Sequence, residues 1–399
     1  MHALILCSVQ CLLALTWTLY VAFLPELAAQ AGLPRSQVAW ILMMDQVIFV
    51  ITDLALGVMA DRVADAMRRL GGWVLAVSVV SALAFVMMPR AASPVWLVAL
   101  TALWAATSSA LRAPPMVLIA RRLHGSVASF LVACSLLGVG LAGAIGPVLT
   151  ARLRDASPTL PFIAASTALV IAVMALRWIE PAAASDSSGT ADPSPASGHR
   201  PRSTHTWLLF AAFGLLALGF QIHTAVNSTP AYLRYVSPAK LVQVAPAFWI
   251  GFALCVLVPE LAALRRHPAR LVLLVAAACG ALALFGVAAA GSLQALLVAQ
   301  CVAGGLWGVL FGAMLRAALD AGHVGHEGAF TGLVFAVAAV AAFVRIATVY
   351  SGASKATPLA SWLPWMPAVA WSMAALLLAA LVLASAAPGR WHTRSLAKP

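Results

Sequence analysis

The chain has 399 residues, of which 63% are hydrophobic and 9% are charged, and its mean hydropathy is +0.98. Soluble domains contain about 45–50% apolar and about 25% charged residues. So few charges cannot cover the surface of a water-soluble protein of this length. The composition therefore excludes a soluble protein and indicates an integral membrane protein with many spans.

Helical membrane spans are the predicted elements of this chain. A helix needs about 20 apolar residues to cross the hydrocarbon core, and twelve segments provide such a run. In chain order they cover residues 3–26, 36–60, 70–89, 94–119, 126–151, 158–179, 206–230, 240–263, 269–290, 292–316, 328–350 and 362–385. Pro230 and Pro246 make the ends of the seventh and eighth spans difficult to place, because proline interrupts helical hydrogen bonding.

One segment differs from everything around it. Residues 180–205 are rich in Ala, Ser, Pro, Gly and Asp and contain almost no large apolar side chain, so burial cannot offset the entropy of ordering them. We predict a disordered cytoplasmic linker there. It separates a six-helix bundle at 1–179 from a second at 206–386, and residues 387–399 form a cytoplasmic tail.

The lysines and arginines predict the orientation. With the N-terminus in the cytoplasm, the inner loops hold 15 of the 24 Lys and Arg residues and the outer loops hold 7. Cytoplasmic loops carry such an excess. We therefore expect a protein of the bacterial inner membrane with both termini on the cytoplasmic side. This asymmetry also explains the net charge of +12 as contact with anionic lipid, and we expect no nucleic-acid partner.

The loop after the second span contains a recognisable pattern. Three residues separate Gly57 from Asp61-Arg62, and the basic pair Arg68-Arg69 follows. Together with the arrangement of six spans, a linker and six spans, this pattern resembles motif A of the major facilitator superfamily. The spacing to the basic pair is longer than that family's usual pattern. The segment 259–270, which holds Glu260, occupies the equivalent position in the second half and reads as a degenerate copy.

The fifth span resembles a second motif of that family, motif C of its proton-coupled exporters. It is rich in glycine and contains Gly143, Gly146 and Pro147, although alanine stands at some expected glycine positions. Glycines also allow close helix packing in any membrane fold. The motif therefore favours efflux only slightly, and helix packing is the simpler role for these residues.

Ionisable residues inside spans are functional candidates, because a charge in the hydrocarbon core is costly. Asp45 lies about 14 Å from the outer end of the second span, near the midplane, where the uncharged carboxyl is favoured. We expect proton coupling through Asp45 or Asp53. Asp53 has a similar depth to Arg112, and we predict an ion pair or shared water network between them. We also hypothesise that Asp45 contacts Arg345 when the protein faces inward.

The resemblance implies a cavity between spans one, four, seven and ten. Polar and aromatic residues on the faces of these spans are the expected lining: Gln10, Trp17, Tyr20, Trp104, Ser108, Arg112, Gln221, His223, Asn227 and Trp307. Several of these residues also suit ordinary helix packing. Such a cavity, aromatic with one fixed cation, suits an amphipathic or weakly anionic organic molecule.

The motif A residues predict a gate on the inner side. Gly57 permits close helix approach, Asp61 can lie at a helix N-terminus of the other half, and Arg62 can pair across the gate. Arg345, in the outer third of its span, is the expected gate residue on the outer side.

These features predict an all-α membrane protein with twelve spans in two pseudo-symmetric bundles, acting as a monomeric secondary transporter driven by protons. No cofactor or metal site is expected, and no cluster of catalytic groups indicates an enzyme. Proton-symport uptake of a small metabolite, an uncoupled facilitator and a non-transporting sensor or assembly protein of the same fold stay open as alternatives.

Overall fold

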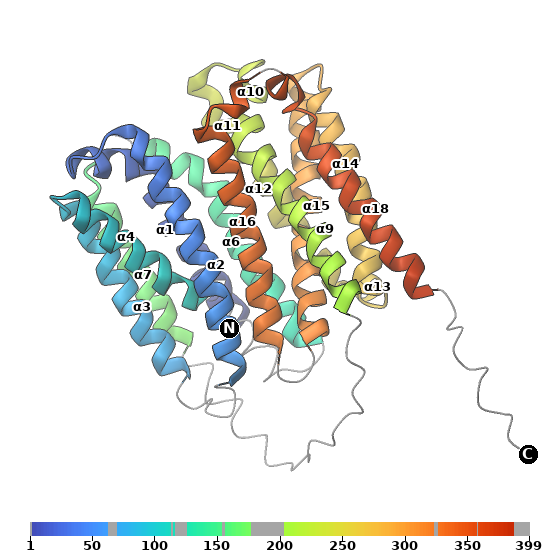
Figure 1. The fold of residues 1–399 in the computed structure, drawn as a ribbon, viewed down its shortest axis with the longest axis horizontal. Helices are drawn as coiled ribbons and strands as arrows, with labels where there is room; N and C mark the ends of the chain where they lie inside the picture. The colour runs from blue at the N-terminus through green and yellow to red at the C-terminus, as the bar shows by residue number, and fades with distance from the viewer. Residues whose placement is uncertain are drawn as a thin grey trace, which may run out of the picture.

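In the computed structural model, the chain forms a bundle of long helices that run side by side (Figure 1). The structure describes residues 2–62, 70–112, 115, 126–153, 156–176, 203–322, 326–356 and 358–386. Within these residues, eleven segments are helical, long and apolar enough to cross a membrane, and a shorter apolar helix lies at the sixth predicted span. The expected linker, apart from its last three residues, and the expected tail lie outside the described residues.

The helices follow the predicted spans closely in both halves. Those of the first half are α1 (His2–Gln30), α2 (Val38–Arg62), α3 (Leu70–Met87), α4 (Pro94–Ser108), α6 (Ser126–Leu153) and α7 (Thr159–Leu176). Those of the second half are α9 (Ser203–Ile222), α10 (Ser228–Leu233), α11 (Leu241–Val244), α12 (Ala247–Cys255), α13 (Ala262–Arg265), α14 (Ala269–Ala288), α15 (Leu293–Gly322), α16 (Glu327–Tyr350), α17 (Leu359–Trp362) and α18 (Met366–Ala386).

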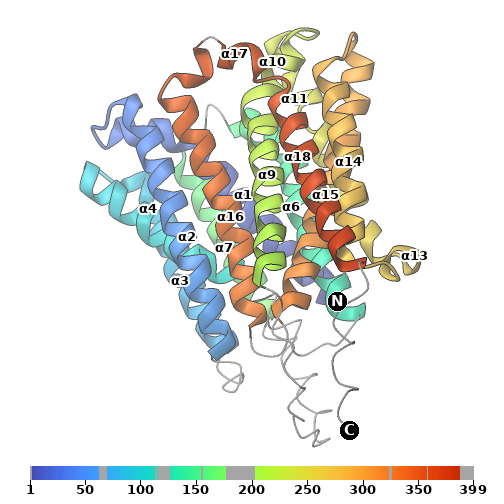
Figure 2. The ribbon, with the colours of Figure 1, turned by 45° about the vertical axis from the view of Figure 1, so that its right-hand side comes forward.

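The two ends of the bundle can be told apart by the helices found there. The helices α1 and α9 begin at one end, α18 finishes there, and we call it the terminal end (Figure 1). The short helices α10, α11 and α17 lie at the opposite end, which we call the distal end (Figure 2). The first residue of α1 and the last residue of α18 therefore lie on the same side of the bundle.

The fourth span departs from the predicted continuous helix. After Ser108 the chain tightens into a 3₁₀ turn at Ser109–Leu111. Pro115 cannot donate an N–H to the carbonyl of Leu111, four residues earlier. The side chain of Gln10 on α1 donates to that carbonyl instead, at 2.6 Å. Most of the remaining predicted span, 113–114 and 116–119, lies outside the described residues.

Proline also shapes the seventh and eighth spans, as the sequence predicts. A π-helical turn at His223–Asn227 separates α9 from α10, and Pro230 within α10 has no N–H for the carbonyl of Val226. In the eighth span, Pro246 separates α11 from α12. These breaks give the second half a less regular distal end than the first.

Two pairs of helices make most of the contacts between the described parts of the two halves. The second span packs against the eleventh (α2 with α16), and the fifth packs against the eighth (α6 with α12). Because a shift of six spans relates α2 to α12 and α6 to α16, these pairs are equivalent under the duplication expected of two six-helix halves. The molecule thus has two related seams between its halves.

Candidate functional site

A cavity of about 390 Å³ lies between the halves, a volume typical of small-molecule sites. Helices of both halves contribute to its wall, which is mostly apolar or aromatic. The residues around it are Gln10, Leu13, Ala14, Trp17, Thr18, Gln46, Phe49, Trp104, Ser108, Arg112, Val139, Gly143, Gln221, Trp249, Phe311, Phe335, Ala338, Ala339, Ala342 and Arg345. Among the described residues that line it, Arg112 and Arg345 are the only charged ones, and both are cationic.

Six of the ten predicted cavity residues line this cavity. They are Gln10, Trp17, Trp104, Ser108, Arg112 and Gln221. In the first half, Trp17 of α1 stacks on Trp104 of α4 with ring centroids 5.9 Å apart. The pair forms one aromatic wall of the cavity.

The other four predicted residues point elsewhere. Trp307 stacks on Phe220, with centroids 4.5 Å apart, within the apolar core of the second half. The side chain of Asn227 donates to the carbonyl of Leu363 at 2.6 Å, so it joins two helices at the distal end. His223 is buried against Gln300, with Nε2 2.8 Å from Oε1. These three side chains therefore point away from the cavity in this structure, and two of them, His223 and Asn227, lie on the π-helical turn.

Tyr20 is the fourth of these residues, and it lies one layer behind the cavity wall. Its side chain is completely buried, and its ring packs against Trp104 at 4.8 Å. Its hydroxyl donates to Oδ2 of Asp45 at 2.7 Å, while Oδ1 of Asp45 has no hydrogen-bond partner among the residues that the structure describes. Asp45 is therefore a buried carboxyl group held behind the aromatic wall by a single neutral donor.

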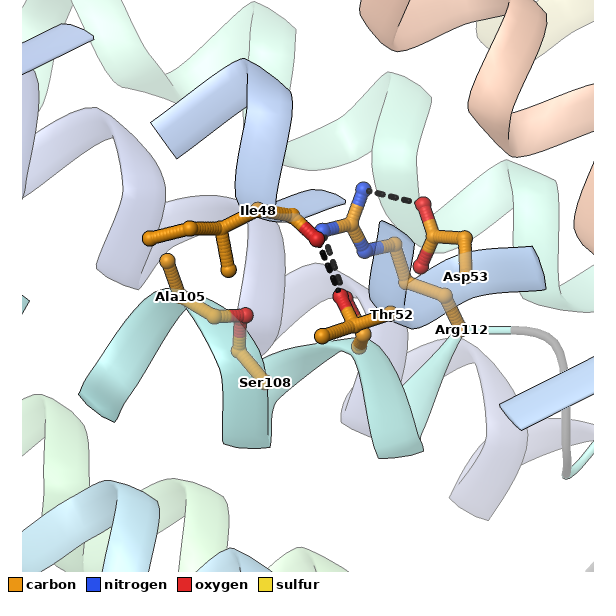
Figure 3. Close-up of polar contacts among 7 residues, drawn as sticks. Ile48, Thr52, Asp53, Ala105, Ser108 and Arg112 are labelled. Atoms are coloured by element: carbon orange, nitrogen blue, oxygen red, sulfur yellow. Dashed lines mark hydrogen bonds and ion pairs between the residues drawn. The ribbon is translucent and has the colours of Figure 1, made fainter. Parts of the chain in front are cut away.

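The predicted ion pair between Asp53 and Arg112 is present. Nη1 of Arg112 lies 3.3 Å from Oδ2 of Asp53 (Figure 3), and Nη2 donates to Ser109 at 3.3 Å. Ser109 in turn lies 2.8 Å from the hydroxyl of Thr52, so a polar chain joins α2 to the end of α4. The guanidinium also lies over the ring of Phe49, 3.8 Å from its centroid.

Asp45 and Arg345 do not pair in this structure. Asp45 has an exposed fraction of 0% and faces α1, whereas its neighbour Gln46 lines the cavity. Successive residues of a helix point about 100° apart, so Asp45 turns away from the side on which Arg345 lies. Arg345 Nε has no hydrogen-bond partner among the described residues. The hypothesised contact in an inward-facing state stays untested.

Several rings of the cavity were not predicted from the sequence. Phe49, Trp249, Phe311 and Phe335 line it, yet an apolar residue on an apolar helix carries no signal that separates cavity from core or lipid. Gln46 did carry such a signal, since it shares a helical stripe with Asp53 and Gly57.

The expected gate at the terminal end has a clear geometry. Asp61 accepts hydrogen bonds from the backbone N–H groups of Gly328 at 2.7 Å and Ala329 at 2.8 Å. These groups belong to the first turn of α16, where the helix dipole favours a negative charge. Asp61 thus caps a helix of the opposite half, as its position in the motif predicts.

Glycines make this approach possible. A Cβ added at Gly57 would overlap the carbonyl oxygen of Gly328, and one at Gly332 would overlap that of Asp53. Arg62, which was expected to pair across the gate, is exposed and forms no ion pair with a residue that the structure describes. The duplicate in the second half has diverged, because Glu260 pairs with Arg265 of its own loop at 3.7 Å.

The glycines of α6 serve two different contacts. A Cβ at Gly143 would overlap the ring of Trp249 on α12, across the seam between the halves. One at Gly146 would lie 3.3 Å from Thr18 on α1, within the first half. Pro147 lies inside the same helix. These two glycines therefore lie at close contacts of α6 with two different helices.

The sequence profile of the Major Facilitator Superfamily matches residues 6–345. The chain belongs to the major facilitator superfamily. This membership makes it an integral membrane protein of a transporter family, with twelve spans in two six-helix halves. No curated protein sequence gives a significant match to this family member.

Solved structures of the superfamily share the fold. The human organic anion transporter MFSD10 (TETRAN) aligns with a TM-score of 0.68 at 14% identity, covering 94% of this chain and 98% of its own. The superfamily transporter FucP in the outward conformation aligns with a TM-score of 0.64 at 14% identity, covering 95% of this chain and 98% of its own. At this identity the likeness concerns the fold.

Proposed function

We propose that the protein is a secondary active transporter that moves a small amphipathic or weakly anionic organic solute by alternating access, coupled to protons. The cavity between the halves carries this proposal. It combines six aromatic rings with two guanidinium groups, and two buried carboxyl groups of α2 lie directly behind its wall.

The cavity chemistry supports an organic solute rather than an inorganic ion. Aromatic faces offer a large area for apolar and ring-bearing molecules, and guanidinium groups recognise carboxylates and other planar anions. The structural neighbour MFSD10 is described as an organic anion transporter, which agrees with this class of solute.

Asp45 is the favoured proton carrier of the two carboxyl groups. Asp53 has a cationic partner in Arg112, and this partner favours a fixed negative charge. Within the described part of the chain, the hydroxyl of Tyr20 is the only partner of Asp45. A carboxyl group without a counter-ion can gain and lose a proton as its access to water changes, which is what coupling requires.

The glycine-rich α6 gives a slight preference for efflux, and proton-symport uptake remains the alternative. We further propose that the protein acts as a monomer in a bacterial inner membrane with both termini in the cytoplasm. The excess of Lys and Arg in the loops that would lie on that side supports this orientation.

Proton coupling can be tested in vesicles that contain the reconstituted protein and a pH-sensitive dye. A library of aromatic acids, amines and neutral amphipathic compounds is added to wild type, Asp45→Asn and Glu26→Gln. Glu26 is an exposed carboxylate on α1, so its variant controls for the change of charge. We expect at least one compound to shift the internal pH with wild type and Glu26→Gln, and the shift to fall at least tenfold with Asp45→Asn.

The direction of the pH change distinguishes symport from antiport. Retention of the full pH shift by Asp45→Asn would exclude Asp45 as the carrier. Labelled compounds that cross without any pH shift in wild type would instead indicate an uncoupled facilitator. If no compound crosses at all, the sensor or assembly alternative is favoured.

A further inference from the structure

The charges around the cavity do not balance. Arg112 and Arg345 are the only charged residues in the part of its lining that the structure describes, and Arg112 is paired with Asp53. No described residue forms an ion pair with Arg345, and its Nε has no hydrogen-bond partner. One positive charge of the cavity is therefore left without a protein counter-ion, at a place where an isolated charge is costly.

The two cations lie at different heights. Asp61 meets Gly328, which gives α2 and α16 a common reference level at the terminal end. Asp53 is eight residues from that level along α2, or about 12 Å, and Arg345 is seventeen residues along α16, or about 26 Å. The free charge therefore lies about 14 Å nearer the distal end than the neutralised one.

Aromatic rings occupy the cavity wall around and between these levels. Trp17, Trp104 and Trp249 line the cavity together with Phe49 and Phe335. A molecule whose charged group lies at Arg345 would place its body against these rings. That arrangement matches a ring-bearing molecule with one charged end.

We propose that Arg345 binds the carboxylate of the transported solute, so that the substrate class is an aromatic monocarboxylate. This inference rests on the transporter function proposed above and specifies its solute. A single carboxylate neutralises the unpaired guanidinium and can accept two parallel N–H bonds from it. A dianion would exceed the one free charge, and a cation would be repelled by it.

The positive potential can be tested without any substrate. Ala342 lines the cavity one turn before Arg345, and a cysteine there, in a chain whose six native cysteines are replaced by alanine, reports the local charge. The measurement is the ratio of its reaction rates with anionic sulfonatoethyl and cationic trimethylammonium-ethyl methanethiosulfonates. We expect Arg345→Gln and Arg345→Met to lower this ratio about tenfold, since local potential changes the encounter rate of charged reagents by such factors.

Selection of a carboxylate is tested with matched probes. Indole-3-acetate and phenylacetate differ from indole-3-acetamide and phenylacetamide only at the charged group. We expect both acids to raise the unfolding temperature of the full-length wild type more than their amides do. Arg345→Gln and Arg345→Met should abolish this difference, and Arg345→Lys should keep part of it.

Lys355→Gln is the matched control, because Lys355 is an exposed cation at the distal end outside the cavity. It should preserve both the rate ratio and the preference for acids. Arg345→Met guards against a folding defect in Arg345→Gln, since it leaves no polar group facing an apolar surface.

Three results would overturn the inference. An unchanged rate ratio in both neutral variants would show that Arg345 does not set the cavity potential. Equal stabilisation by acid and amide in wild type would exclude carboxylate selection while leaving the proposed transport of an organic solute intact. If neither member of any pair stabilises wild type, the aromatic solute class fails together with the carboxylate.

Discussion

The charge on Arg112 is balanced by a carboxylate that is completely buried. Asp53 has an exposed fraction of 0% and the side chain of Arg112 is 21% exposed. Removing one member of such a pair leaves the other charge without compensation, whereas removing both leaves no charge at all. We therefore expect Asp53→Asn and Arg112→Gln each to lower stability, and the double variant to lose less than the sum of the two, with a coupling of about 1–3 kcal/mol.

Unfolding temperatures of the four proteins in one detergent measure this coupling. Thr52→Val is a useful control, because it removes a hydroxyl of the same polar chain without changing any charge. Thr52→Val should lower the unfolding temperature less than Asp53→Asn or Arg112→Gln does. Additive losses in the double variant would mean that the two side chains do not stabilise each other.

The same residue pair shows what a sequence can predict at this scale. Depth along two helices predicts which charged residues lie at the same level. For Asp53 and Arg112, this was sufficient to predict their ion pair. It does not give the rotation of each helix, so it could not show that Asp45 faces Tyr20 in this structure. Helix rotation also decides that Trp307 belongs to the core. The sequence does not show this, because apolar residues lie on every face of the helix that holds Trp307.

At the scale of one element, α6 carries two sets of glycines with different neighbours. A Cβ at Gly138 would overlap the backbone carbonyl of Cys7 on α1, while one at Gly143 would overlap only the ring of Trp249 on α12. Backbone cannot move aside without shifting a whole helix, but a side chain can adopt another rotamer. We expect Gly138→Ala to lower stability by about 1–3 kcal/mol, and Gly143→Ala to preserve stability while slowing transport at least threefold.

Thermal unfolding and uptake into vesicles separate these two effects. Gly286→Ala serves as the control, because a Cβ there would have its nearest neighbour at 3.7 Å, an ordinary contact distance. A loss of stability in Gly143→Ala equal to that of Gly138→Ala would show that both glycines only pack helices together.

Element boundaries were predictable wherever the sequence carried a physical break. Pro246 marks the separation of α11 from α12, and twelve apolar runs correspond to twelve apolar helical segments. The early 3₁₀ turn of the fourth span was not predicted, because it depends on Gln10 from α1 reaching the carbonyl of Leu111. A contact across about 100 residues of sequence leaves no local pattern.

At the scale of the whole molecule, the halves are joined along two seams that must loosen if access is to alternate. The α2–α16 seam is held at its terminal end by Asp61 on the first turn of α16. At its distal end, the indole N–H of Trp40 donates to the hydroxyl of Tyr350 at 2.9 Å, and Trp40 is 58% exposed. The buried glycine contacts and the charged cap make the terminal end the stronger of the two seals.

This difference predicts which substitution opens the cavity toward the terminal end. Asp61→Ala removes two hydrogen bonds to a carboxylate, each worth about 1.5–3 kcal/mol, together with a favourable dipole interaction. In a chain whose native cysteines are replaced, a cysteine at Leu13 in the cavity wall should then react about tenfold faster with a membrane-impermeant thiol reagent added from the terminal side. Its rate from the distal side should not rise.

Arg62 provides the control. It distinguishes an effect of the Asp61 cap from an effect of changing any charge in this loop. Arg62 follows Asp61 directly, is exposed and forms no ion pair with the described residues, so Arg62→Ala should leave the reaction rate within twofold of wild type. Asp61→Asn should give an intermediate rate, because the amide oxygen still accepts one hydrogen bond but the charge is lost. Equal effects of Asp61→Ala and Arg62→Ala would contradict the cap as the element that holds the halves together, and would leave the glycine contacts of α2 and α16 as the seal.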